Sequence, residues 1–325
     1  MLGGTTVQIA VIALTIIGLW IGARALVDST VRIARRFGVS ELTIGLTIVA
    51  MGTSTPELIV TVDAALAGLG DIGVGNVVGS NAYNLAFILG AVSLLRVIPV
   101  ERSLVHRDGV VLVLSTLVGF AALFDRTVTA VEGALLLGAF VAYTVYLIRD
   151  EATAHSIETE YTDSRVTGVI PTRFSHRARD ALLLVGGLAV VLVSGHFMVE
   201  AASSLARGVG VSDWVIGGTI VAAGTSTPEL AVSLVAMRQG HVGMSVGNVV
   251  GSNVFNILGI LGIASLLRPL AVGGAAIETL VWLTVLTVLM VAALWSGRRL
   301  SRSEGALFVC SELARWLLGL LRIFG

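Results

Sequence analysis

Long apolar stretches separated by short polar segments recur along the whole chain, as at Val7 to Ile21, Gly109 to Phe124 and Thr279 to Trp295. An α-helix needs roughly 20 predominantly apolar residues to cross a bilayer, and the stretches approach or exceed that length. The pattern predicts an all-α membrane protein with ten transmembrane helices. We place them near residues 5–25, 41–67, 73–95, 108–124, 130–148, 179–201, 213–238, 245–267, 276–296 and 304–323.

The composition agrees with a location in the lipid bilayer. Hydrophobic residues make up 55% of the 325 positions and charged residues only 13%, whereas roughly one-quarter of the residues in soluble domains are charged. We therefore expect the protein to be surrounded by the lipid bilayer and to bind no nucleic acid. Protein partners are not indicated by any segment. The single cysteine, Cys310, cannot form a disulfide within the chain.

Two halves of the chain repeat each other at an offset of 172 residues. Ile44 to Val60 (IGLTIVAMGTSTPELIV) matches Ile216 to Val232 (IGGTIVAAGTSTPELAV), and Val74 to Asn84 (VGNVVGSNAYN) matches Val246 to Asn256 (VGNVVGSNVFN). Each half holds five of the predicted helices. Because five is odd, the second copy enters the membrane from the opposite side, so the sequence predicts two inverted repeats.

The chain then divides into three parts. Residues 1–148 form the first five-helix repeat, residues 149–178 form a polar linker of mixed charge, and residues 179–325 form the second five-helix repeat. We expect the linker to be a solvated tether between the two halves, with a regulatory role as the alternative.

Arginine placement tests the inversion, since positive charge accumulates on the cytoplasmic side of membrane proteins. Most arginines fall in the loops that follow odd-numbered predicted helices. We therefore expect both termini to be extracytoplasmic and the linker to be cytoplasmic. Arg24, Arg32 and Arg36 of the first repeat correspond to His196, Ser204 and Gly208 of the second, as two copies of opposite orientation would require.

The sequence Gly-Thr-Ser-Thr-Pro-Glu interrupts one apolar stretch in each repeat, at residues 52–57 and 224–229. Proline inside a helix removes a backbone donor and pushes away the carbonyl four residues earlier, so carbonyls near Gly52 and Gly224 are expected to lose their helical partners. The glutamates that follow, Glu57 and Glu229, lie at a depth where an ionised group costs at least about 2.5 kcal/mol.

Carboxylate, carbonyl and hydroxyl oxygens together suit small hard cations such as Ca²⁺ or Na⁺ rather than soft transition metals. We therefore interpret the two breaks as halves of one cation site at the interface of the repeats. The structural alternative is that Glu57 and Glu229 are protonated and hydrogen-bonded to a neighbouring helix.

A second repeated block adds neutral polar side chains inside the membrane. It comprises Asn76, Ser80, Asn81 and Asn84 in the first half and Asn248, Ser252, Asn253 and Asn256 in the second. Residues four apart share a helix face, so Ser80 and Asn84 are expected to point together toward the centre. The alternative is that this block serves close helix packing, which we expect of the glycines Gly75, Gly79, Gly247 and Gly251.

Two carboxylates in one cavity favour exchange over a channel, because their charge must be neutralised before the cavity can switch between the two sides. A hydrolase with Ser54 or Ser226 as nucleophile would need a base beside the serine, and no pair of histidines recurs in the predicted helices. We therefore expect a transporter, not an enzyme, and no cofactor.

These motifs resemble the two signature repeats of the sodium/calcium exchanger superfamily of cation/Ca²⁺ antiporters, in the compact prokaryotic and archaeal form. The resemblance covers essentially the whole chain. It implies a multi-pass plasma-membrane antiporter that exchanges Na⁺ for Ca²⁺, three Na⁺ per Ca²⁺, while the first and sixth helices slide across a rigid core. Proton-coupled relatives share the motifs, so H⁺/Ca²⁺ exchange stays as the alternative.

The resemblance also implies the ion ligands. Glu57 and Glu229 are the central ones, aided by backbone carbonyls of Thr53 and Thr225. Further Na⁺ ligands would be Ala50, Ser54, Ser80 and Asn84 in the first half and Ala222, Ser226, Ser252 and Asn256 in the second. Several relatives, including the potassium-dependent branch, have Asp where this chain has Asn256, so potassium dependence is not expected.

Overall fold

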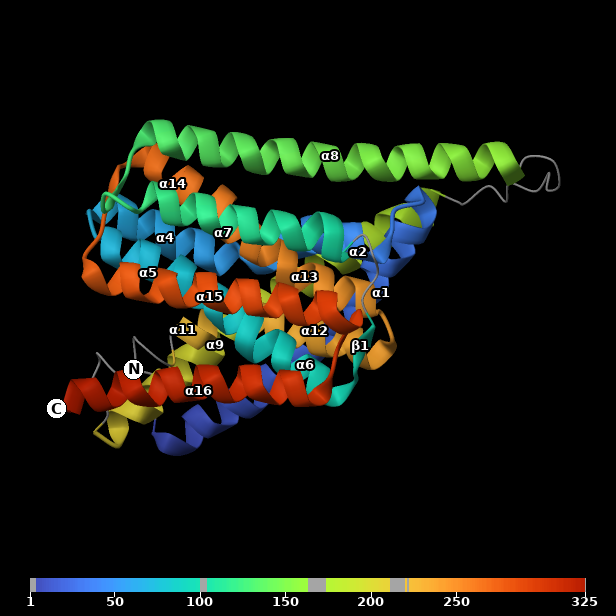
Figure 1. The fold of residues 1–325 in the computed structure, drawn as a ribbon. Coiled ribbons are helices and arrows are strands. Elements are labelled where there is room, and N and C mark those ends of the chain that lie inside the picture. Colours follow the sequence, from blue (N-terminus) through green and yellow to red (C-terminus); the bar gives the residue numbers. More distant parts are fainter. Residues whose placement is uncertain (1–3, 100–103, 163–173, 211–219, 221, 325) are drawn as a thin grey trace.

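The protein is a bundle of long helices that run between two ends (Figure 1). The computed structural model describes residues 4–99, 104–162, 174–210, 220 and 222–324. Within these ranges, seven helices are long and apolar enough to cross a membrane. An eighth span results if Glu41–Thr53 and Thr55–Ala67, which meet at an angle of 48°, count as one broken helix. The chain is therefore a mostly helical, multi-pass membrane protein.

Most elements lie at the predicted stretches, but α1 and α8 continue to Phe37 and Thr162, past the expected ends at residues 25 and 148, so residues 149–162 of the expected linker are helical. The first half contains α1 (Thr5–Phe37), α2 (Glu41–Ile44), η1 (Gly45–Val49), α3 (Ala50–Thr53), α4 (Thr55–Ala67), α5 (Gly70–Ala82), η2 (Tyr83–Leu89), α6 (Gly90–Leu95), β1 (Ile98–Pro99), η3 (Leu104–Gly109), α7 (Val110–Ala122), β2 (Thr127–Val128) and α8 (Ala130–Thr162). The second half contains α9 (Phe174–Gly208), α11 (Ala222–Thr225), α12 (Thr227–Gln239), α13 (Val242–Val254), η5 (Phe255–Ile260), α14 (Leu261–Leu267), β3 (Leu270–Ala271), α15 (Gly274–Gly297), β4 (Arg299–Leu300) and α16 (Arg302–Phe324).

Two of the ten predicted spans are not among these candidates. The span expected at residues 213–238 lies partly outside the described residues. The span expected at residues 304–323 is present as the helix α16, which carries the charged residues Glu304, Glu312 and Arg315.

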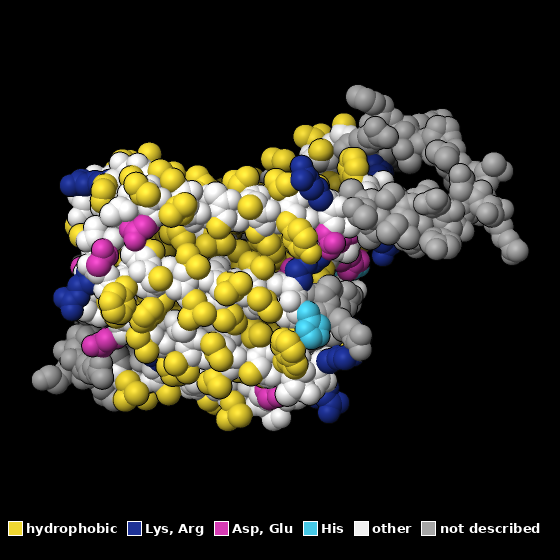
Figure 2. All heavy atoms as spheres, turned by 45° about the horizontal axis from the view of Figure 1, so that its top comes forward, with side chains coloured by type: hydrophobic (Ala, Val, Ile, Leu, Met, Phe, Trp, Pro, Cys, Tyr) yellow, Lys and Arg dark blue, Asp and Glu magenta, His cyan; other side chains and the backbone are white. Residues whose placement is uncertain are grey.

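The surface has the layered polarity of a protein that sits in a bilayer. Hydrophobic side chains cover the middle of the face in Figure 2, and most charged side chains gather toward the two ends of the bundle. The chain termini lie together at one end in Figure 1, whereas α8 ends and α9 begins at the opposite end, where β1 also lies.

Two small sheets tie the halves together. β1 pairs with β4 through Ile98 and Leu300, and β2 pairs with β3 through Val128 and Leu270, both antiparallel. Adding 172 to the residues of β1 gives those of β3, and adding 172 to those of β2 gives those of β4. The two sheets are thus copies of each other, each joining a strand of the first half to a strand of the second.

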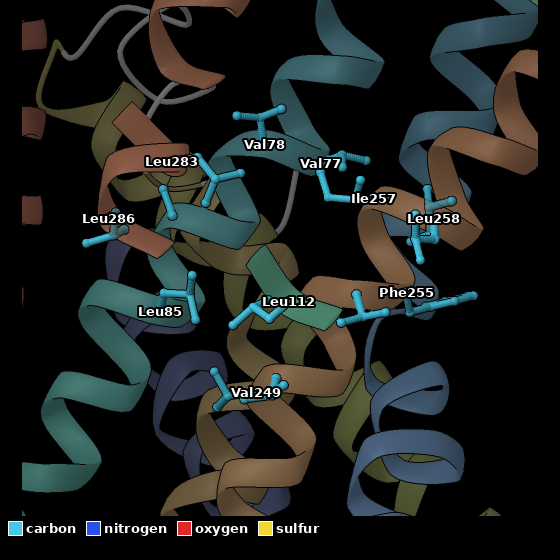
Figure 3. Packing of buried hydrophobic residues seen from close by; sticks show 14 of the residues in the cluster. Val77, Val78, Leu85, Leu112, Val249, Phe255, Ile257, Leu258, Leu283 and Leu286 are labelled. Carbon is cyan, nitrogen blue, oxygen red and sulfur yellow. The ribbon is translucent and has the colours of Figure 1, made fainter. Parts of the chain in front are cut away.

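The main apolar core lies where α5 and η2 of the first half meet α13 and η5 of the second (Figure 3). Val77, Leu85, Val249 and Ile257 are fully buried there. Interiors of proteins are packed as densely as organic crystals, so this core holds the central helices in fixed relative positions. The long helices α1 and α9 pack on each other beside it and share a second core with α12.

Glycines permit the closest helix contacts, as predicted for Gly247 and Gly251. The same prediction is wrong for Gly75 and Gly79, because nothing lies within 4 Å of a Cβ added at either position. A Cβ on Gly247 would lie 2.6 Å from the Leu42 carbonyl oxygen, and one on Gly251 would lie 2.5 Å from the Leu46 carbonyl oxygen. α1 and α9 meet similarly, because a Cβ on Gly187 would lie 2.7 Å from the backbone nitrogen of Leu26. These contacts leave no room for a side chain.

We predict that Gly251→Ala will destabilise the protein by about 1–3 kcal/mol, because its new methyl group would force α13 away from the backbone of η1. The measurement is the midpoint of thermal unfolding in detergent. Gly138→Ala is the matched control, since Gly138 lies in α8 with nothing within 4 Å of its added Cβ, and alanine favours a helix. Equal midpoints for the two variants would contradict the close packing of α13.

Candidate ion-binding site

The two helix breaks meet in the interior, and each half donates a hydrogen bond to the glutamate of the other. Ser54 Oγ donates to Glu229 Oε1 at 2.8 Å, and Ser226 Oγ donates to Glu57 Oε1 at 2.9 Å. All four side chains are completely buried. The structure thus brings together the two carboxylates that are 172 residues apart in the sequence.

Each carboxylate is only half satisfied. Glu57 Oε2 and Glu229 Oε2 are buried and accept no hydrogen bond. In the described part of the chain, neither glutamate forms an ion pair with an arginine or a histidine. A buried, unpaired carboxylate is costly, so the pair requires a bound cation or a proton.

The helix breaks lie where the sequence predicted them, but one freed carbonyl finds a partner within its own half. Pro56 occupies the first turn of α4, and its missing N–H leaves the Gly52 carbonyl without a helical donor. Thr55 Oγ1 donates to that carbonyl oxygen at 2.7 Å. The Gly52 carbonyl thus lacks a helical donor, as expected, but the hydroxyl one residue before the proline takes the place of that donor.

The carbonyl oxygen of Ala50, two residues before Gly52, does reach the site. Ala50, at the start of α3, presents its carbonyl oxygen to Ser252 Oγ at 3.4 Å and to Thr53 Oγ1 at 3.3 Å. Its counterpart Ala222 begins α11 in the second half. The break therefore carries backbone acceptors as well as a carboxylate.

The asparagines of the repeated block divide into two groups, and the first group positions the glutamate-bearing helices. Asn76 Nδ2 donates to the Glu57 carbonyl oxygen at 3.2 Å, and Asn248 Nδ2 donates to the Glu229 carbonyl oxygen at 3.4 Å. Each asparagine also donates at 3.1 Å to a hydroxyl one turn beyond its glutamate, in Thr61 and Ser233 respectively.

Thr61 and Ser233 were missed by the sequence reasoning. The signal was available, because both carry hydroxyl groups, both follow a glutamate by four residues and both occupy matching positions of the repeat. Their side chains are fully buried. A hydroxyl at a matched buried position of both repeats was as informative as the asparagines.

The second group of asparagines keeps free oxygens. Neither side-chain atom of Asn84 has a hydrogen-bond partner, and Asn256 Oδ1 has none either. Asn256 Nδ2 donates to Asn81 Oδ1 at 2.9 Å, while Asn81 Nδ2 donates to the Asn253 carbonyl oxygen at 2.9 Å. Amide oxygens without donors are acceptors available to a cation.

The serines of the block lie beside the breaks. Ser252 Oγ is 3.5 Å from Glu229 Oε1, and Ser80 Oγ is 3.5 Å from Thr225 Oγ1. Thr53 Oγ1 in turn donates to Asn248 Oδ1 at 3.1 Å. Hydroxyls from both halves therefore surround the two carboxylates.

The arrangement offers two negative charges and several neutral oxygens. The described residues contain no cluster of three or more His, Cys, Asp or Glu side chains that could hold a metal. The charge available is therefore that of two carboxylates, supplemented by hydroxyl, amide and carbonyl oxygens, which is the ligand chemistry of Ca²⁺ and other hard cations.

A cavity of about 600 Å³ approaches the breaks from one side. It is lined by α9 and α4 and reaches Pro56, Thr225 and Pro228. In the opposite repeat, the elements that correspond to α9 and α4 are α1 and α12. The gap between them is closed, because α1 packs directly against α12 and Arg238 lies over the Trp20 ring, 5.3 Å from its centroid. Access to the interior is thus unequal on the two sides.

Comparison with known proteins places these features in a family. The family model described as "Sodium/calcium exchanger protein" matches residues 7–149 and 180–311. The chain is 38% identical to the "Putative antiporter CaxA" of Alkalimonas amylolytica over 284 residues, which cover 85% of this chain and 87% of that protein. It is 31% identical to the "Sodium/calcium exchanger MaX1" of Methanosarcina acetivorans over 341 residues, covering 95% and 97% of the two chains.

The fold agrees with a solved structure of the same kind. The sodium-calcium exchanger NCX_Mj, in crystals soaked with 10 mM Na⁺ and zero Ca²⁺, superposes with a TM-score of 0.82 and 28% sequence identity. The match covers 96% of this chain and 98% of that one. The chain therefore belongs to the sodium/calcium exchanger family of membrane transporters.

Proposed function

We propose that this protein is a secondary antiporter that exchanges Na⁺ for Ca²⁺ by alternating access, with the ions bound at the midplane between Glu57 and Glu229. The observation that carries the proposal is the pair of buried carboxylates, each with one oxygen held by a serine of the opposite half and one oxygen without a partner. The relatives named sodium/calcium exchangers support the choice of ions.

Charge balance explains why exchange, rather than one-way movement, suits this site. One Ca²⁺ neutralises two carboxylates, whereas Na⁺ must bind in a larger number and use neutral oxygens as well. An empty site would leave two buried charges uncompensated. The conformational switch is therefore favourable only when the site is loaded, and the resemblance implies three Na⁺ for each Ca²⁺.

The proposed ligands combine both breaks and both repeated blocks. Carboxylate oxygens come from Glu57 and Glu229, and carbonyl oxygens from the backbone around Thr53 and Thr225. The remaining proposed ligands are Ala50, Ser54, Ser80, Asn84, Ala222, Ser226, Ser252 and Asn256. The free amide oxygens of Asn84 and Asn256 support their assignment to Na⁺.

We propose that the fold consists of ten helices in two inverted five-helix repeats, residues 1–148 and 179–325, joined by the linker 149–178. The two matching sheets support the inversion, because each pairs strands from different halves at corresponding positions of the repeat. α1 begins and α16 ends at one end of the bundle, and α8 ends and α9 begins at the other, which supports termini and linker on opposite sides of the plasma membrane. The arginine distribution makes the linker side cytoplasmic in this proposal.

Alternating access would involve α1 and α9 moving across the core. The unequal access supports this, since α9 is separated from α4 by a cavity while α1 is packed against α12. In an inverted repeat, exchanging the roles of the two helices would close one side and open the other.

Proton/Ca²⁺ exchange is a second candidate, favoured by the same unpartnered oxygens Glu57 Oε2 and Glu229 Oε2. Each could carry a proton where the first proposal places Na⁺. The relative from Alkalimonas amylolytica is named only as a putative antiporter and does not distinguish the two.

The driving ion is testable with purified protein in liposomes. We expect Ca²⁺ uptake when Na⁺ is loaded inside and absent outside, at equal pH on both sides. Uptake that follows an imposed pH gradient and ignores the Na⁺ gradient would overturn Na⁺ coupling and support the proton alternative.

Replacing either glutamate should abolish exchange without unfolding the protein. For Glu57→Gln and Glu229→Gln we expect Ca²⁺ uptake to fall by about two orders of magnitude or more, because ligand charge tunes Ca²⁺ affinity strongly. Asp63→Asn is the matched control, since Asp63 lies on the same helix as Glu57 but is exposed. Full activity in either glutamine variant would remove that glutamate from the site.

Asn84 and Asn81, which lie on the same helical segment of the repeated block, should differ in their effects. Asn84→Ala removes no hydrogen bond within the protein, so we expect the unfolding midpoint without ions to stay unchanged while the Na⁺ concentration for half-maximal exchange rises. Asn81→Ala loses its hydrogen bonds to Asn253 and Asn256. It should reduce the free energy of unfolding by about 1–3 kcal/mol and therefore lower the unfolding midpoint. A lowered midpoint for Asn84→Ala with unchanged Na⁺ dependence would contradict its role as a ligand.

A further inference from the structure

A second cavity, of about 540 Å³, lies between α1 and the beginning of α9, away from the carboxylate pair. Its volume falls within the range of about 300–1,000 Å³ that is usual for small-molecule sites. It lies at the end of the bundle where α1 ends near α2 (Figure 1). The charged residues that line it are Arg24, Arg32, Arg36, Arg179, Asp28 and Asp180.

We call this cavity the arginine pocket, because four arginines and two aspartates line it and leave an excess of two positive charges. Both aspartates already contact side chains of the protein. Asp180 is almost fully buried and pairs with Arg32 Nε at 2.8 Å and Arg36 Nη1 at 3.0 Å. Asp28 Oδ1 accepts a hydrogen bond from Gln239 Nε2 at 3.0 Å. Asp28 Oδ2 also lies 4.0 Å from Arg24 Nε, so the two carboxylates offset two of the four arginine charges and leave a net charge of plus two.

Arg24 and Arg179 are the two arginines left for a ligand. Arg24 is exposed, and its nearest ion pair is a loose one with Asp28 at 4.0 Å. Arg179 is exposed and forms no ion pair in the part of the chain that the structure describes. Because the two guanidinium groups come from different helices, one anion between them would connect α1 to α9.

The rest of the lining is apolar and partly exposed. Trp20, Ile21 and Leu183 line the same cavity, and the Trp20 and Ile21 side chains are 42% and 58% exposed. Tryptophan is enriched at the level of lipid headgroups. The cavity thus combines arginines, which can bind a phosphate group, with an apolar surface that can contact acyl chains.

We propose that the arginine pocket binds the headgroup of an anionic phospholipid. Its phosphate would lie between Arg24 and Arg179, which can donate paired hydrogen bonds to phosphate oxygens, and its acyl chains would lie along Ile21 and Leu183. Basic pockets between transmembrane helices are a known form of lipid recognition. The bound lipid would hold α1 and α9 together at this end.

The corresponding face of the second repeat lacks this chemistry. The positions matching Arg24, Arg32 and Arg36 are His196, Ser204 and Gly208. The proposed site therefore exists on one side of the membrane only, and this asymmetry does not depend on which ions the protein transports.

The test is direct binding of a fluorescent phosphatidylglycerol to the purified full-length protein in detergent. We expect saturable binding that phosphatidylcholine with the same acyl chains does not displace. Arg24→Gln and Arg179→Gln should each weaken binding about fivefold, and the double variant about 25-fold. The matched control is Arg35→Gln with Arg96→Gln, two exposed arginines outside the pocket, which should bind as the unchanged protein does.

Several outcomes would overturn the assignment. Equal binding by the Arg24→Gln/Arg179→Gln variant and the control would show that Arg24 and Arg179 contribute only to the overall charge and form no specific site. Displacement by phosphatidylcholine would show that acyl chains alone are recognised. Full displacement by glycerol phosphate or inorganic phosphate at the lipid's own concentration would assign the pocket to a soluble anion. Because binding is read without transport, these results are separate from the test of ion exchange.

Discussion

The burial of two carboxylates in the interior of the bundle is the constraint on which the rest of the structure depends. Glu57 and Glu229 are fully buried, and each receives a hydroxyl hydrogen bond from the other half of the chain. These bonds satisfy only one oxygen of each carboxylate. The cost of burying the other oxygen of each carboxylate must be offset by a bound cation or a proton. The stability of the closed interior therefore depends on that partner.

The surrounding framework holds these groups in place. Asn76 and Asn248 fix the backbones of the glutamate-bearing helices, and the dense core between α5, η2, α13 and η5 fixes the asparagines. The π-helical segments η2 and η5 contain Asn84 and Asn256. Such segments alter the spacing of side chains within a helix and often occur at functional sites.

Much of the site could be predicted because its sequence motifs occur once in each half of the chain. A single proline and glutamate in an apolar stretch could be a kink with a protonated side chain, whereas two copies at a constant offset imply a shared centre. The sequence could not say that Thr55 would take the Gly52 carbonyl, or that Asn81 would serve structure while Asn84 keeps free atoms. These differences depend on which neighbour comes within hydrogen-bond distance after folding.

The sequence by itself determined the membrane location, the repeat, the helix breaks and the identity of the buried charges. Hydrophobic length, proline geometry and the cost of an ionised group in lipid are local properties that do not depend on the fold. Only the tertiary structure decided that Ser54 faces Glu229 rather than its own Glu57, that access to the site is unequal, and that arginines of α1 and α9 enclose one pocket. These features arise from packing between distant segments, and no local pattern specifies which partner a buried polar group will meet.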